Sequence, residues 1–148
     1  MYVFQEYDQC KKRFAETQKR YAEIMDEKEE LFAMTQPNAV DTEKERVSGG
    51  KPVNAFDQYL IQKQKLRIDE RLLEIKELLD DRERLLEIKE EELYESRHVY
   101  DKIYRLKYLE RYRVYRIAMN VGYSESHVFR ILKFIQNMIG NESLNPLQ

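Results

Sequence analysis

Six polar or charged side chains lie close together near the carboxyl end of the chain: Ser124, Glu125, Ser126, His127, Arg130 and Lys133. Their donors and acceptors suit base edges in a major groove, where an arginine binds guanine through two hydrogen bonds and a carboxylate accepts from cytosine. Glu125 has an alternative role, because a negative charge also stabilises the first turn of a helix. Three preceding arginines, Arg111, Arg113 and Arg116, are expected to meet phosphates and to add affinity that falls with salt. These residues predict binding to duplex DNA.

The sequence offers few candidate residues for catalysis or for binding of a metal or cofactor. No nucleophile and base can be assigned as a pair, so we expect that the protein is not an enzyme. Helical di-iron sites require two Glu-x-x-His pairs. His98 has Glu95 three residues before it, whereas His127 has Ser124 at that position, so only one such pair is present. A single cysteine, Cys10, excludes a disulfide or a cysteine-based zinc site within one chain. Gly49-Gly50 lack the spaced glycines and the Lys-Ser/Thr of a phosphate loop. We expect no cofactor and no metal.

The elements that must position the six side chains follow a helix-turn-helix pattern from Val114 to Lys133. Ala118 is small enough for two helices to cross closely, and Gly122 can adopt the positive φ of a sharp turn. Ser124 is expected to cap the second helix, and Gly140 with Asn141 to end it near Ile139. Five slots expected to face inward hold apolar residues: Ile117, Val121, Tyr123, Val128 and Ile131.

Charge supports this interpretation. The segment from Arg97 to Phe134 contains nine Lys or Arg residues and three Asp or Glu residues. Its net charge is therefore +6, whereas the whole chain has a formal net charge of -2. A basic module on an acidic chain is typical of nucleic-acid binding. A helix expected over 96–112 precedes the pattern and has a tyrosine at every fourth position from Tyr100 to Tyr112. We interpret these rings as core, and the alternative is that some hydroxyls reach phosphates.

The run from Arg105 to Ile135 resembles phage-encoded transcription regulators with a sigma-70 region 4-like helix-turn-helix, namely late-gene activators of the RinA and ArpU type and related uncharacterised phage families. The resemblance rests on Arg111-Tyr112, Ile117-Ala118, Gly122-Tyr123-Ser124, Val128 and Arg130, with Gly49-Gly50 and Pro52 upstream. Met119-Asn120 depart from the acidic residues that are more frequent in that family. The resemblance implies activation of late or packaging genes at a promoter with host RNA polymerase.

The rest of the chain predicts an all-α protein, with a long helical hairpin or coiled-coil region before the helix-turn-helix domain. The expected organisation is an amphipathic helix over 1–35, a linker over 36–55, a coiled-coil-like helix over 56–95, the DNA-binding domain over 96–140 and a tail over 141–148. Two prolines and a glycine pair indicate the linker. Heptad spacing indicates the helices.

A seam of apolar residues follows the long helix: Ile68, Leu72, Ile75, Leu79, Leu86 and Leu93. Such a seam is typical of helix packing or oligomerisation. One partner could be residues 2–35 folded back, and another a second subunit, most simply in a homodimer.

No stretch is apolar for long enough to cross a membrane, and the first residues lack the order of a secretion signal, so we expect the cytoplasm of a bacterial host cell. Two alternatives to a transcription regulator remain. One is a DNA-packaging protein resembling a small terminase subunit. The other is a helical interaction or adaptor protein that does not bind DNA.

Overall fold

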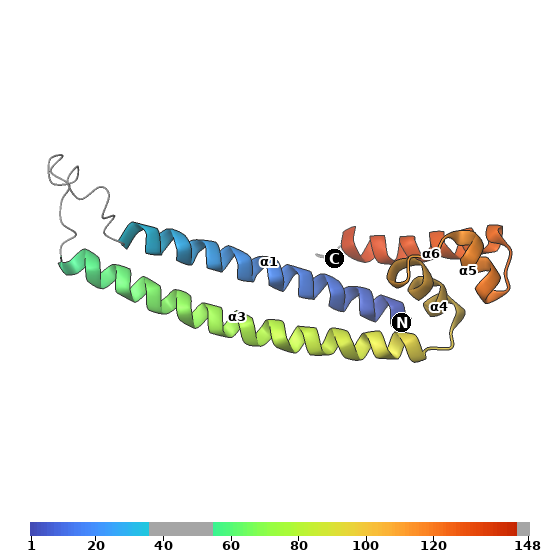
Figure 1. Cartoon of the computed structure of the whole chain (residues 1–148), viewed down its shortest axis with the longest axis horizontal. Helices are drawn as coiled ribbons and strands as arrows, with labels where there is room; N and C mark the ends of the chain where they lie inside the picture. Colours follow the sequence, from blue (N-terminus) through green and yellow to red (C-terminus); the bar gives the residue numbers. More distant parts are fainter. Residues whose placement is uncertain (36–54, 145–148) are drawn as a thin grey trace. The chain divides into compact units, whose positions relative to one another are not determined.

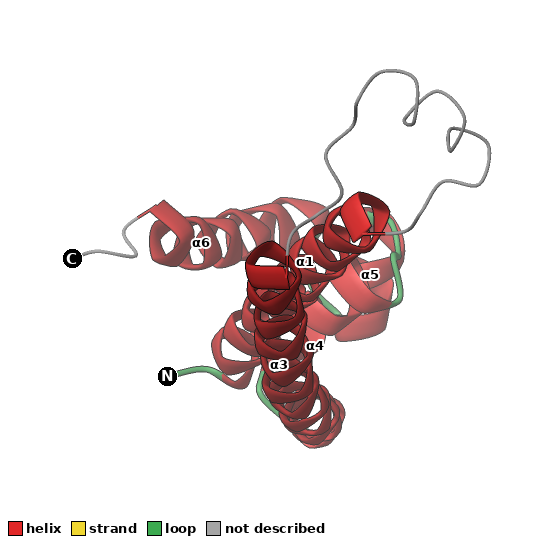
Figure 2. Ribbon diagram, turned by 90° about the vertical axis from the view of Figure 1, so that its left-hand side faces the viewer, coloured by secondary structure: helices red, strands yellow, loops and turns green. Residues whose placement is uncertain are grey.

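The computed structural model describes residues 1–35 and 55–144, and all regular structure in these ranges is helical (Figure 2). The helices are α1 (Val3–Thr35), α3 (Ala55–Glu95), α4 (Val99–Tyr104), the π-helical turn η1 (Arg105–Leu109), α5 (Val114–Val121) and α6 (Glu125–Leu144) (Figure 1). The expected all-α class is therefore confirmed. The predicted linker over 36–55, except residue 55, and the last four residues of the predicted tail lie outside the described residues.

The chain divides into two compact units. Unit 1 comprises Met1–Ala15 and Asp81–Gln148, and unit 2 comprises Glu16–Asp80. Each unit therefore contains a part of α1 and a part of α3, and each is described by itself below.

Unit 2 is a pair of helical segments that run side by side in opposite directions (Figure 1). Ile24 of α1 and Ile68 and Ile75 of α3 are its buried apolar residues among those described. Ion pairs flank this contact, with Lys28 Nζ 3.0 Å from Asp69 and Arg71 3.1 Å from Glu27. Exposed pairs of this kind contribute only about 0.2 to 1 kcal/mol each, so the isoleucines supply most of the packing energy.

The seam of α3 is covered by residues of the same chain. Ile68, Ile75 and Leu72 pack with the α1 segment of unit 2. Leu86 and Leu93 pack in the core of unit 1, which includes Phe4 and Tyr7 of α1, whereas Leu79 is half-buried. Five of the six residues predicted for oligomerisation or helix packing thus pack with other residues of the same chain, and a second subunit would need another surface.

Unit 1 has a larger core, to which every one of its helices contributes. Its buried residues are Phe4, Tyr7, Leu93, Ile103, Tyr104, Leu106, Ile117, Ala118, Val128, Ile131, Leu132 and Ile135. Aromatic rings extend it, because Phe4 stacks on Tyr104 with centroids 5.5 Å apart. The interpretation of the tyrosines as core is confirmed, since Tyr104 is buried and Tyr100, Tyr108 and Tyr112 pack against it.

A buried carboxylate joins α1 to α4. Asp101 Oδ1 accepts from the Phe4 backbone N–H at 2.9 Å, and Oδ2 accepts from the Ser96 hydroxyl at 2.6 Å. Free N–H groups at the first turn of a helix require an acceptor, and Asp101 provides one for α1 from a distant part of the chain. The amino-terminal residues are thereby part of the carboxyl-terminal fold.

Two expected helix boundaries were wrong. Gly140 and Asn141 do not end α6, which continues to Leu144. A glycine inside a helix costs only about 1 kcal/mol. Lys12 of α1 donates to the Ile139 carbonyl at 3.2 Å, a contact that local sequence does not predict.

The single helix expected over 96–112 is instead α4 followed by η1. His98 caps α4, since its Nδ1 accepts from the Tyr100 N–H at 3.1 Å. After η1, Arg111 adopts a left-handed conformation with φ 57°, and the Tyr112 N–H donates to the Leu106 carbonyl at 2.9 Å. No Gly or Pro marks this change of direction in the sequence.

Candidate functional site

The turn between α5 and α6 places the predicted side chains. Gly122 has φ 76° and ψ 26°, in the left-handed region, and its N–H donates to the Ala118 carbonyl at 2.9 Å. Ser124 Oγ accepts from the His127 N–H at 3.2 Å, which caps the first turn of α6. The predicted conformation of Gly122 and the predicted cap at Ser124 are both confirmed.

Buried side chains fix which face of α6 is exposed. Ile117, Val128 and Ile131 are buried as predicted, and Val121 is half-buried. Ala118, the small residue predicted at the helix crossing, is buried as well. The inward position predicted for Tyr123 was wrong, because its side chain is 36% exposed and its ring stacks on His127 with centroids 4.4 Å apart. Stacking on the His127 imidazole covers one face of the Tyr123 ring at the surface, so the ring does not need to enter the core.

The opposite face of α6 presents polar side chains to solvent. Ser126, Arg130 and Lys133 follow one another at spacings of four and three residues, which places them on one stripe of the helix. We call these three residues the α6 ridge. Glu125 and His127 are exposed beside it, and Ser124 is exposed in the turn. The structure thus brings all six predicted residues to one end of α6 and leaves them accessible.

Sequence reasoning missed one member of this stripe. Asn137 lies four residues after Lys133, on the same face, and is exposed. Its amide is a type of group that binds adenine through two hydrogen bonds. Helical periodicity continued beyond Lys133 would have identified it.

The three predicted phosphate-binding arginines are also exposed, at the amino-terminal side of α5. Arg113 has extended backbone and is the residue before α5. The Arg116 guanidinium lies 4.1 Å from the centre of the Tyr112 ring, a cation–π contact that limits its motion. The left-handed backbone of Arg111 sets the direction in which this short connection leaves η1.

Basic side chains of this region are available for a partner. Among the described residues, Arg111, Arg113, Arg130 and Lys133 form no ion pair with Asp or Glu. Arg105 differs, because it donates to the Tyr94 carbonyl at 3.1 Å and lies over the Tyr94 ring. Within residues 111–133, five exposed cations outnumber the one exposed acid, Glu125, so this part of the surface has a positive net charge: the cations are Arg111, Arg113, Arg116, Arg130 and Lys133.

Apolar side chains are exposed beside the same turn, and sequence reasoning did not single them out. Met119 is 80% exposed, and Tyr115 and Phe129 are each more than half exposed. Tyr115, Met119 and Tyr123 line a shallow depression beside Gly122. Exposed apolar groups that lie close together mark interaction surfaces in general.

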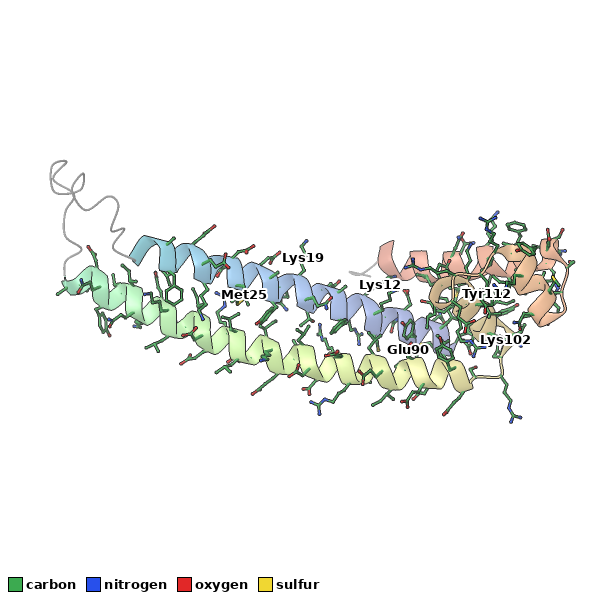
Figure 3. The ribbon with its side chains drawn as sticks, in the orientation of Figure 1. Lys12, Lys19, Met25, Glu90, Lys102 and Tyr112 are labelled. Atoms are coloured by element: carbon green, nitrogen blue, oxygen red, sulfur yellow. The ribbon has the colours of Figure 1, made fainter. Side chains whose placement is uncertain are left out.

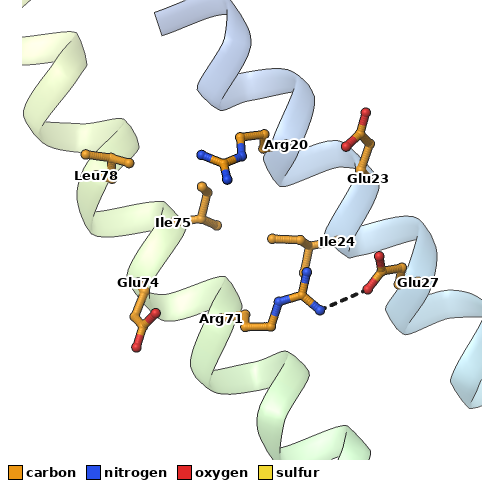
Figure 4. Close-up of a pocket in the computed structure, with 8 residues that line it drawn as sticks. All are labelled: Arg20, Glu23, Ile24, Glu27, Arg71, Glu74, Ile75 and Leu78. Atoms are coloured by element: carbon orange, nitrogen blue, oxygen red, sulfur yellow. Dashed lines mark hydrogen bonds and ion pairs between the residues drawn. The ribbon is translucent and has the colours of Figure 1, made fainter. Parts of the chain in front are cut away.

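A second groove lies in unit 2, between α1 and α3, and its walls are mostly charged (Figure 4). Arg71 and Glu27 pair across it, with Ile24 and Ile75 at its base (Figure 4). This arrangement offers opposite charges that neutralise one another and no nucleophile. Across residues 1–35 and 55–144, no group of three or more His, Cys, Asp or Glu side chains is placed to hold a metal ion.

Comparison of the chain with protein-family models, curated proteins and solved structures finds no significant match. None of the described helices combines the length and the apolar character that crossing a membrane requires.

Proposed function

We propose that unit 1 binds double-stranded DNA as a helix-turn-helix protein, with α6 in the major groove and α5 across the backbone. The observation on which this proposal depends is the α6 ridge, an exposed polar stripe whose cations have no acidic partner among the described residues. The Gly122 turn and the Ser124 cap support it, because they give α6 a defined start next to α5. Early outward positions of the second helix meet base edges in this class of protein.

Each side chain has a separate role in this proposal. Arg130 binds guanine through two hydrogen bonds, a contact that contributes about 1 to 3 kcal/mol of discrimination. Ser124, Ser126, His127 and Lys133 make further contacts to bases, and Glu125 accepts from cytosine or stabilises the start of α6. Arg111, Arg113 and Arg116 bind phosphates, which position the protein without reading sequence.

The biological output is proposed from the family resemblance of residues 105–135. We infer that the protein is a sequence-specific transcription regulator, an activator of phage late or packaging genes that acts at a promoter with host RNA polymerase. Cationic side chains explain DNA affinity but not the sign of regulation, so this part of the proposal needs its own test. A reporter gene behind a promoter selected by the protein, assayed with and without the protein, distinguishes activation from repression.

The direct test measures binding of the full chain to a pool of random-sequence duplexes by fluorescence anisotropy over a range of salt concentrations. Arg130→Ala with Lys133→Ala should weaken binding at least tenfold, because it removes both cations of the α6 ridge. The matched control is Lys19→Ala with Lys76→Ala, which removes the same charge from exposed positions of unit 2. Figure 3 shows Lys19 on α1. Equal affinity of the two double variants would contradict the proposal.

A second candidate function is protein binding by the same end of unit 1. It is favoured by the exposed side chains of Tyr115, Met119 and Phe129, which DNA phosphates do not require. Met119→Ser with Phe129→Ser separates the two functions. DNA affinity that survives this change, together with a loss of polymerase-dependent activation, would indicate that the apolar residues bind a protein while the α6 ridge binds DNA.

A further inference from the structure

The α3 segment of unit 2 has a second apolar stripe, on the face opposite the seam. Tyr59, Leu66 and Leu73 follow one another at seven-residue intervals, and their side chains are 60%, 65% and 65% exposed. Two residues along an α-helix correspond to a rotation of about 200°. Leu66 and Leu73 therefore point away from Ile68 and Ile75, which are buried against α1. We call Tyr59, Leu66 and Leu73 the outer stripe.

Three charged residues lie on the same face as the outer stripe. Lys63, Glu70 and Glu77 are exposed, and none forms an ion pair with another described residue. Each follows an outer-stripe residue by four positions, which is the spacing of alternating core positions in a coiled coil. The face therefore combines the heptad spacing of a helix-packing surface with charges that select the orientation of a partner helix.

We propose that the outer stripe binds the outer stripe of a second copy of this chain, with the two α3 helices antiparallel and the symmetry axis near Leu66. In this arrangement Leu66 meets the partner's Leu66, and Tyr59 meets the partner's Leu73. Lys63 then lies within about one residue of level with the partner's Glu70, and the reverse pair forms by symmetry. A parallel arrangement would instead place Lys63 against Lys63 and Glu70 against Glu70, and like charges destabilise such layers. Charge thus favours the antiparallel pair.

The packing of unit 2 gives a reason for a second copy. Its buried apolar residues, among those described, are three isoleucines, which is little for segments of this length. Pairing of outer stripes would remove three further large side chains per copy from water. The outer stripe has only three apolar side chains per copy, so the association of two copies should be weak, with a dissociation constant on the order of micromolar.

This inference is independent of DNA binding, because all of its residues lie in unit 2 and none belongs to the α6 ridge. It also replaces the expectation that the seam from Ile68 to Leu93 supplies the contact between subunits. Five of the six seam residues pack with other residues of the same chain. The outer stripe is a surface that a second copy can reach without unfolding unit 2.

Sedimentation equilibrium of the full chain tests the surface. The wild type should show a concentration-dependent dimer, and Leu66→Glu should weaken it at least a hundredfold, since the change acts twice at the symmetry axis. Leu60→Glu is the matched control, because Leu60 is also exposed on α3 but lies off the outer stripe. Circular dichroism checks that all variants keep their helices. A wild type that stays monomeric, or equal effects of both variants, would overturn the proposal.

Disulfide trapping tests the orientation, in a Cys10→Ser background that removes the only native thiol. Mixing a Tyr59→Cys chain with a Leu73→Cys chain should give the mixed cross-link, whereas Tyr59→Cys alone should give little. Cross-linking of Tyr59→Cys with itself and none with Leu73→Cys would overturn the antiparallel pair. Lys63→Glu should weaken the dimer about tenfold, and adding Glu70→Lys should restore it, because the pair between chains is rebuilt with its charges exchanged.

Discussion

Gly122 carries the chain from α5 into α6 with a backbone conformation that most residues avoid. A Cβ at this position would meet no atom within 4 Å, so the cost of a substitution comes from the positive φ alone. Gly122→Ala should lower the free energy of unfolding by about 1 to 2 kcal/mol, measured by urea denaturation of the full chain. Gly122→Asn is the control, because asparagine tolerates this region better and should lose less. Equal stability of the alanine variant and the wild type would refute the argument.

Tyr104 makes the stability of unit 1 sensitive to alkaline pH. Burial raises the pKa of its hydroxyl above the ordinary value of 10.0, and the nearby Asp8 adds to the shift. Burial also raises the pKa of Tyr7. A raised folded-state pKa means that stability is fully present below pH 10 and is lost as pH rises above it, because the unfolded chain releases the protons first.

Thermal melts of the full chain should therefore show a melting temperature that falls steadily as the pH rises above 10. Tyr104→Phe should reduce the slope of this fall, although it also removes the long hydrogen bond, 3.4 Å, from the Tyr104 hydroxyl to Asp8. Phenylalanine keeps the ring that stacks on Phe4. An unchanged slope in the variant would mean that other groups cause the alkaline loss.

Arg130 and Arg113 are both exposed arginines, yet the proposed complex gives them different effects. Arg130→Ala should relax base preference at one position and weaken the best site by about 1 to 3 kcal/mol. Arg113→Ala should weaken all sequences alike and reduce the slope of log affinity against log salt by about one. Selection from random duplexes, followed by salt titration of the best and a scrambled site, measures both. If both variants only changed the salt slope, α6 would not be reading bases.

Among the elements, α1 depends on α4 for the satisfaction of its first turn. Asp101 accepts from Phe4 N–H and from Ser96 at one buried site. Asp101→Ala should lower the free energy of unfolding by about 1 to 3 kcal/mol, because two buried donors lose their acceptor. Asp101→Asn should cost less, since its carbonyl oxygen can still accept from Phe4. Urea denaturation followed by near-ultraviolet circular dichroism of the tyrosines reports this change in unit 1.

How far the elements could be predicted depends on how local their causes are. The turn at Gly122 and the cap at Ser124 arise from neighbouring residues, and both were predicted. The extension of α6 past Gly140 was not predicted, because Gly140 and Asn141 are typical of a helix end. The contact of Lys12 with the Ile139 carbonyl joins residues distant in sequence and could not be predicted from spacing either. The Tyr123 side chain could either enter the core or stack on the His127 ring at the surface, and residue type alone does not decide between these two positions.

The seam of α3 shows a different limit. Ile68, Leu72 and Ile75 have a spacing that suits a helix of the same chain as well as a helix of another chain. Only the structure shows that α1 covers them. The heptad pattern predicted that this face of α3 packs against a helix, but the identity of that helix depends on how the chain folds back.

At the scale of the whole molecule, the two units differ in how much apolar surface they bury. Among the described residues, the core of unit 1 contains twelve buried side chains and that of unit 2 contains three. Local opening should therefore require less free energy in unit 2 than in unit 1. A second copy at the outer stripe would raise the stability of unit 2 alone, by mass action.

Hydrogen exchange followed by mass spectrometry checks this difference. Amides of 16–33 and 55–80 should exchange faster than those of α4, α5 and the first turns of α6, because few apolar contacts oppose their opening. Raising the protein concentration through the dimer range should slow exchange around Leu66 and leave α5 unchanged, since only the outer stripe gains a partner. Leu66→Glu should abolish this concentration dependence while Leu60→Glu retains it. Uniform protection of both units at every concentration would show that the small core of unit 2 does not control its opening.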